Sequence, residues 1–165
     1  MRNLIARSLV PITLICGLLV PTPNAPIAAA AGPTTYMVTN VSGDPAASGS
    51  LPWALMQANY VTPGFDYIRF DLPVWPIQEI VITQPLWVND SVDISVPLDT
   101  AGPTVGIRGT NLPYLFILQS DPTLGVTSSS TTIAGLGMTG FTDAALVTTP
   151  AAQGLFIQNN WIGFA

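Results

Sequence analysis

The amino-acid sequence predicts an all-β fold, a parallel β-helix in which short strands coil into a solenoid behind one short amphipathic helix. Three observations lead to this prediction. Short apolar runs follow one another between turn residues, and the 165-residue chain holds 16 Pro and 14 Gly. Apolar residues recur 24 positions apart, as Ile133 and Ile157 or Met138 and Ile162 do. Helical spacing is found in one stretch, residues 48–59.

Residues 1–31 have the composition of an export signal peptide. Arg2 and Arg7 provide a basic start, residues 8–20 form an apolar centre, and small residues with Ala-x-Ala spacing follow. The apolar centre of about 13 residues is shorter than the roughly 20 that span a bilayer, which favours cleavage near Ala31 over a retained anchor. Cleavage removes Cys16, the single cysteine. We therefore expect a secreted or cell-surface protein of bacterial type, without disulfides and without a stable membrane span.

Residues 32–65 are expected to hold a first strand at 34–42 and a capping helix. Ser50 is a favourable N-cap residue, and Pro52 is tolerated in the first helical turn. The apolar residues at i, i+3, i+4 and i+7 are Leu51, Ala54, Leu55 and Ala58. A solenoid exposes an apolar opening and unpaired backbone groups at its first rung, so we expect the helix to cover that end.

Residues 66–165 are expected to form the rungs. The expected strands are 66–72, 80–83, 91–96, 104–109, 114–119, 131–141, 145–149 and 155–164. Two more spacings fit a coil, since Ile94 and Ile117 differ by 23 positions and Ile107 and Ile133 by 26. The alternative is an antiparallel sandwich that pairs consecutive strands. The run of Gln and Asn at 158–160 favours the coil, because Asn tolerates the left-handed backbone at a turn between rungs.

The stretch "SGSLPWALMQANYVTPGFDYIRFDLP", residues 48–73, resembles the N-terminal signature of exported right-handed parallel β-helix proteins of the pectate-lyase-like class. The matching positions are Gly49, Ser50 and Leu51 in the turn, Ala54, Leu55, Ala58 and Asn59 in the helix, and Asp66, Ile68 and Phe70 in the first-rung strand. The resemblance implies a right-handed coil with a structural cap. Pro52 departs from the pattern, because the family usually carries Arg there. Family members continue for many more rungs, so we expect a truncated chain that stops within a rung after about four turns.

Acidic residues are the remaining candidates for chemistry, since a chain without His lacks the common nucleophile–base pairs and imidazole metal sites. Asp66 and Asp71 differ by five positions and so lie on opposite faces of a strand, which predicts structural roles. Asp90, Asp93 and Asp99 form the densest acidic patch, but a Ca²⁺ site needs six to eight oxygen ligands. We predict a solvated acidic surface and no catalytic, cofactor-binding or metal-binding residues.

The charge balance limits the partners. The net charge of −5 argues against nucleic acid as a ligand. Arg69 and Arg108 are the two cations beyond the signal, and each is expected to pair with a nearby acid rather than to hold a substrate.

Four tryptophans are candidates for contacts with sugar rings. Trp53 is expected in the helical cap, whereas Trp75, Trp87 and Trp161 could stack on sugars from the flank of the solenoid. Packing in the cap or the core is the favoured alternative for them.

The expected function is a non-catalytic exported or cell-surface module, adhesion-like or a scaffold, which contacts a polysaccharide or a surface protein and self-associates through its open C-terminal rung. The alternative is the N-terminal part of a pectate-lyase-like polysaccharide-active enzyme, with its active site beyond residue 165. A third alternative is a sandwich-type sugar-binding module.

Overall fold

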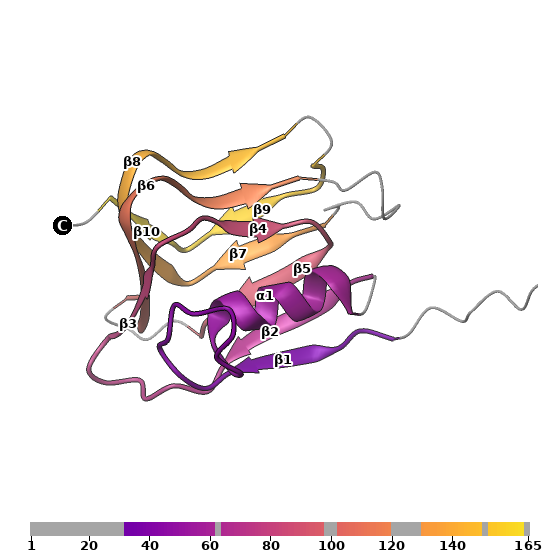
Figure 1. Ribbon diagram of the computed structural model, residues 1–165, viewed down its shortest axis with the longest axis horizontal. Helices are drawn as coiled ribbons and strands as arrows, with labels where there is room; N and C mark the ends of the chain where they lie inside the picture. The colour runs from indigo at the N-terminus through magenta and orange to yellow at the C-terminus, as the bar shows by residue number, and fades with distance from the viewer. Residues whose placement is uncertain (1–31, 62–63, 98–101, 120–129, 150–151, 164–165) are drawn as a thin grey trace, which may run out of the picture.

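The protein is a parallel β-solenoid of about three turns with one short helix, as a computed structural model shows (Figure 1). The described residues thus form fewer turns than the four expected from the sequence. The structure describes residues 32–61, 64–97, 102–119, 130–149 and 152–163. The predicted signal peptide, residues 1–31, lies outside the described residues. The all-β parallel coil predicted from the sequence is confirmed.

The described residues form ten strands and one helix. Their bounds are β1 Thr35–Val38, α1 Leu51–Tyr60, β2 Asp66–Phe70, β3 Gln78–Ile82, β4 Leu86–Val88, β5 Val92–Ser95, β6 Val105–Leu118, β7 Thr132–Ala134, β8 Leu136–Thr148, β9 Phe156–Gln158 and β10 Trp161–Ile162. One sheet has the order β1-β2-β5-β7-β9, and the other has the order β10-β8-β6-β3, with β4 beside the second half of β6. Every pairing between the described strands is parallel, so the sandwich alternative is wrong.

The register between rungs tests the predicted spacing. Ile133 pairs with Ile157 and Met138 pairs with Ile162, as predicted. The other two spacings are wrong, because Ile94 pairs with Ile133 and Ile107 with Met138. The rungs have unequal lengths, since the connections between β5 and β6 and between β6 and β7 add residues. A single period therefore holds only for the last pair of rungs.

The long strand β6 merges the predicted strands 104–109 and 114–119, and β8 merges the second part of the predicted strand 131–141 with 145–149, whereas the first part of 131–141 forms β7. Their pairing contains register shifts between Arg108 and Leu112 and between Leu112 and Tyr114. At this irregular corner Gly109 and Gly140 lie so close that a Cβ on either residue would overlap the backbone of the other. Each long strand thus turns the corner between two walls without leaving the sheet.

The core is a stack of inward-pointing aliphatic side chains from successive rungs. Ile68, Ile80, Ile94, Ile107 and Ile133 are each at most 1% exposed. They alternate with outward-pointing residues, the two-residue period of a strand with one buried face. Full burial of each such side chain contributes about 1.5–3 kcal/mol to stability.

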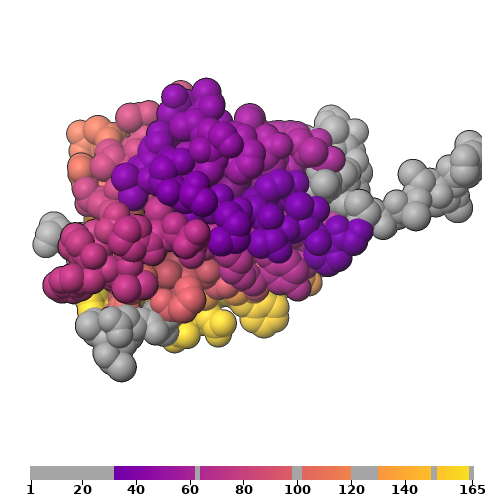
Figure 2. All heavy atoms as spheres, turned by 90° about the horizontal axis from the view of Figure 1, so that it is seen from below, coloured from indigo at the N-terminus to yellow at the C-terminus, as the bar shows by residue number. Residues whose placement is uncertain are grey.

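The N-terminal end of the stack is covered by α1 and the segment before it, which Figure 2 shows spread over that end of the molecule. Ser50 is the N-cap residue, and its Oγ accepts a hydrogen bond of 3.1 Å from the Trp53 amide. The apolar side of α1 is buried in the core through Leu51, Ala54, Leu55 and Ala58. Within the described part of the chain, no helix has the length and apolar character needed to cross a membrane.

Candidate functional site

A buried asparagine connects α1 to the short strand β4. Asn59 Nδ2 donates to the Trp87 carbonyl at 2.8 Å, and the Asn89 amide donates to Asn59 Oδ1 at 2.9 Å. The amide side chain thereby offers β4 the donor and acceptor that a neighbouring strand would offer. Asn89 Nδ2 in turn donates to the Tyr60 hydroxyl at 2.9 Å, which fixes the aromatic ring at the end of α1.

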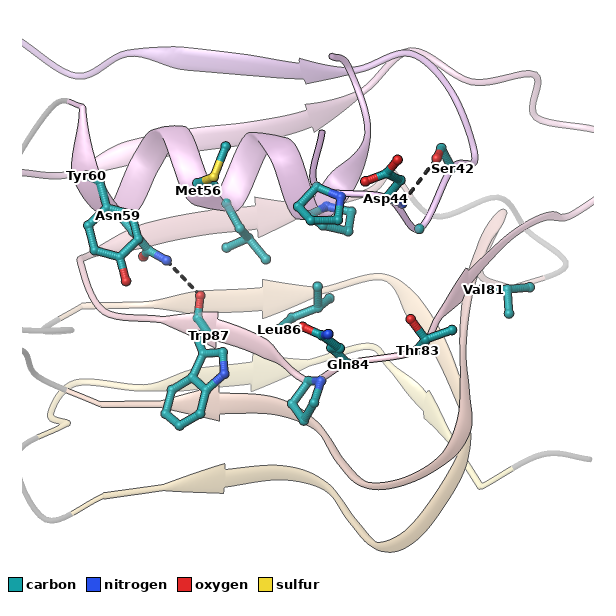
Figure 3. A pocket seen from close by; sticks show the side chains of 15 residues that line it. Ser42, Asp44, Met56, Asn59, Tyr60, Val81, Thr83, Gln84, Leu86 and Trp87 are labelled. Carbon is teal, nitrogen blue, oxygen red and sulfur yellow. Dashed lines mark hydrogen bonds between the residues drawn. The ribbon is translucent and has the colours of Figure 1, made fainter. Parts of the chain in front are cut away.

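Between α1 and the β3–β4 segment lies an open groove of about 640 Å³ (Figure 3). This volume is within the range of ordinary ligand sites. Its lining includes Ser42, Asp44, Met56, Tyr60, Gln84 and Trp87. Tyr60 and Trp87 lie at one end of the view, and Ser42 and Asp44 lie at the other (Figure 3).

Two exposed aromatic rings line the groove. Tyr60 is 56% exposed and Trp87 is 45% exposed. Trp87 points outward because it is the middle residue of a three-residue strand whose neighbours, Leu86 and Val88, are buried. The aromatic faces are thus held at the surface by the backbone pattern of β4 and by the hydrogen bond to Tyr60.

The opposite wall of the groove is a tight loop that precedes α1. Asn40 Oδ1 accepts from the Ser42 amide at 3.1 Å, and Asp44 Oδ1 accepts from the Ala46 amide at 2.8 Å. Gly43 lies against the Val81 carbonyl so closely that a Cβ would overlap it. Successive side-chain-to-backbone turns and this close approach give the groove a preformed wall.

Two buried carboxylates lie away from the groove and tie rungs together. Asp66 Oδ1 accepts from the Thr34 amide at 2.8 Å, and Asp90 accepts from the Gly64 and Ser91 amides at 2.7 Å each. Burial raises the pKa of the Asp90 carboxyl, with a smaller contribution from the charge of Asp66, while the two backbone donors act in the opposite direction. Both carboxylates accept hydrogen bonds from backbone amides, so their role is structural.

Arg69 and Arg108 form ion pairs across neighbouring rungs, as predicted. Arg69 pairs with Asp93, and Arg108 pairs with Glu79, each at 3.0 Å. Among the residues that the structure describes, no group of three His, Cys, Asp or Glu side chains could hold a metal ion. The predicted solvated acidic surface is wrong for Asp90, which is 3% exposed, and Asp93 is half-buried in its ion pair with Arg69. Asp99, the third member of the predicted acidic patch, lies outside the described residues.

The first-rung and helix positions named from the sequence fall into distinct environments. Asp66 and Ile68 are buried, Phe70 packs against the core from a half-buried position, and Asp71 is exposed. Asn59 joins α1 to β4 and so borders the groove. The strand β4 was missed, since "LWV" is too short to show a period.

One tryptophan packs in the helical cap and three are exposed, which corrects the prediction that all of them pack in the cap or the core. Trp53 packs edge-on against Tyr36, with ring centroids 6.3 Å apart, in the helical cap as expected. Trp75 is 77% exposed, and Trp87 and Trp161 are nearly half exposed. Packing in the cap or the core was the wrong expectation for these three, because each lies on an outward position of a strand or a surface connection.

The fold and the groove define this protein as a capped parallel β-solenoid with a preformed surface site. Comparisons with protein-family models, with curated proteins and with solved structures found no match to the chain.

Proposed function

We propose that this protein is a non-catalytic exported or cell-surface module that binds carbohydrate, in the manner of an adhesin, through the groove beside α1. The observation that carries the proposal is the presence of two exposed aromatic rings, Tyr60 and Trp87, in one preformed groove. Sugar rings present apolar C–H faces that stack on aromatic rings, and their hydroxyls pair with neutral groups such as the Gln84 amide and the Ser42 hydroxyl.

The acid content of the groove supports binding rather than cleavage. Glycoside hydrolysis uses two carboxyl groups that flank the scissile bond. Asp44 is the one carboxylate among the described residues that line the groove, and its Oδ1 is engaged with the Ala46 amide. The alternative, an enzyme of the pectate-lyase-like class with its active site beyond residue 165, has no support from the geometry of this groove.

Export and a right-handed, pectate-lyase-like coil complete the proposal. Support for export comes from the composition of residues 1–31. Support for the class comes from the residues that carried the resemblance, since Ser50 caps α1 and Asn59 joins it to the first turn of the coil.

The test is binding of neutral and acidic hexasaccharides, for example β-1,4-linked glucose, β-1,4-linked mannose and α-1,4-linked galacturonate, measured by calorimetry. Trp87→Ala should lower the affinity for the bound sugar by about tenfold or more, the usual effect of truncating a central tryptophan. Trp75→Ala removes an equally large exposed ring outside the groove and is the matched control. Equal losses in both variants, or no binding by the unmodified protein, would contradict the proposal. Cleavage of a hexasaccharide would favour the enzyme alternative.

A further inference from the structure

A row of outward positions crosses four strands of the second sheet. The register aligns Glu79 on β3 with Gly106 on β6, Gly106 with Gly137 on β8, and Gly137 with Trp161 on β10. The residues that follow the first three along the chain, Ile80, Ile107 and Met138, point into the core. In the middle of this outer face, Gly106 and Gly137 therefore present only backbone atoms to the surface.

The fold does not require either glycine. Neither has a positive φ angle, so the backbone conformation suits any residue. The nearest atom to a Cβ would be 3.9 Å away at Gly106 and 3.6 Å away at Gly137, which are ordinary van der Waals distances. Glycine within a strand weakens it and often marks a place where a ligand approaches the backbone. The two glycines thus weaken their strands, although neither the backbone conformation nor a close contact requires glycine at these positions.

What the glycines leave open is a slot of about 190 Å³ on the outer face of the sheet. Its walls include Ile77, Thr139 and Trp161. The Trp161 ring lies against Gly102, where a Cβ would overlap it, so one wall is an anchored aromatic ring. The Glu79 carboxylate belongs to the lining and is paired with Arg108.

We infer that this slot, the glycine trough, is a second carbohydrate site, one that takes a neutral sugar. The inference rests on the proposed function for the class of ligand. A flat floor of peptide groups and the Trp161 ring suit the C–H faces of a sugar ring, while the lining residues Glu79 and Thr139 supply groups for its hydroxyls.

The charges at the trough select a neutral ligand. Glu79 and Arg108 neutralise each other, and the whole chain has a net charge of −5, which disfavours an acidic polysaccharide. Four strands span about 14 Å at the usual spacing, so a short oligosaccharide can follow the row from Glu79 to Trp161.

The test uses glycine substitutions that fill the trough without loss of structure. In Gly106→Ala/Gly137→Ala, and more so in Gly106→Val/Gly137→Val, the added methyl groups occupy the slot. Both variants should melt at or above the temperature of the unmodified protein. Their affinity for the neutral hexasaccharides of glucose or mannose should fall by about tenfold or more, or one of two binding events should disappear from the titration. Thr35→Val, an outward position on β1, is the control and should bind normally.

The remaining outcomes overturn the inference in separable ways. Glycine variants that bind as the unmodified protein does, while Trp87→Ala abolishes binding, would refute the trough and leave the groove proposal intact. Glycine variants that unfold would show that the fold needs both glycines, which removes the argument. Absence of neutral-sugar binding by the unmodified protein would refute both proposals. Preferred binding of the galacturonate hexasaccharide in the trough would refute the charge argument.

Discussion

At the scale of single residues, polar side chains in this solenoid mostly replace missing backbone partners. Asn160 illustrates this use. Its Oδ1 accepts from the Leu136 amide at 2.9 Å and its Nδ2 donates to the Ile133 carbonyl at 2.8 Å, which joins the turn after β9 to the turn below it. Asn159 beside it has a φ of 57°, the left-handed conformation that the sequence predicted for this run. Amide and carboxylate side chains thus hold adjacent rungs in register.

Asp90 predicts a pH dependence of stability. Because its pKa is raised above the ordinary value of 3.8, the folded state binds the proton more tightly than the unfolded chain does. The contribution of Asp90 to the free energy of unfolding is therefore greatest below that value and declines as the pH rises through the folded pKa. Asp90→Asn does not titrate, and its amide cannot accept from both Gly64 and Ser91, so it should be less stable by about 1–3 kcal/mol.

The measurement for Asp90 is urea unfolding of both proteins between about pH 3.5 and pH 7. The stability advantage of the unmodified protein over Asp90→Asn should shrink as the pH rises. An advantage that grows with pH would mean that the ionised form is the favoured one, contrary to the direction of the pKa shift.

At the scale of elements, α1 provides β4 with the hydrogen-bond partners that a neighbouring strand would provide, through the side chain of Asn59. We predict that Asn59→Ala lowers the free energy of unfolding by about 2–4 kcal/mol, because the buried Trp87 carbonyl and the Asn89 amide both lose their partner. Hydrogen exchange at the Asn89 amide should accelerate. Asn40→Ala is the control, since Asn40 also makes two side-chain hydrogen bonds, but near the surface. There water replaces the side chain, and the loss should be about 1 kcal/mol or less. Equal losses in the two variants would contradict the role of Asn59.

The elements that the sequence predicted well are those with a local signal. The helix at 51–60 has a cap residue and a 3.6-residue period, and β2 alternates buried Asp66 and Ile68 with outward Tyr67 and Arg69. The strand β4 has three residues, too few to show a period, and its position depends on Asn59, far from it in the sequence. A contact of that kind is decided by packing, which a single sequence does not display.

The candidate sites were less predictable than the fold for the same reason. Trp87 was recognised as a possible sugar contact, but its neighbour in the groove, Tyr60, was not, because the two come together only when α1 packs on β4. The row from Gly106 to Gly137 depends on a register of 31 positions, which the constant period of about 24 did not anticipate. Because the connections between rungs differ in length, residues that pair in neighbouring rungs are not separated by a constant number of positions in the sequence.

At the scale of the whole molecule, the two ends of the described solenoid differ. The first rung is covered by α1, whereas β9 and β10 have a strand neighbour on one side only among the described residues. Ile157 and Ile162 occupy inward positions, in line with Ile133 and Met138, yet they are 40% and 49% exposed. Phe156 and Trp161 add further exposed apolar area on the same rung. Exposed apolar side chains next to unpaired strand edges favour association.

We predict that the 165-residue polypeptide self-associates through β9 and β10. Sedimentation velocity should show a mass that rises with protein concentration, because each rung gains a strand partner and buries its apolar residues when two ends meet. Ile157→Lys places a charge in that interface and should shift the equilibrium toward the monomer. Met37→Lys, at an exposed position of β1 on the covered end, should leave the association unchanged. An unmodified protein that stays monomeric at high concentration, or a Met37→Lys variant that dissociates as Ile157→Lys does, would show that this end is not the point of contact.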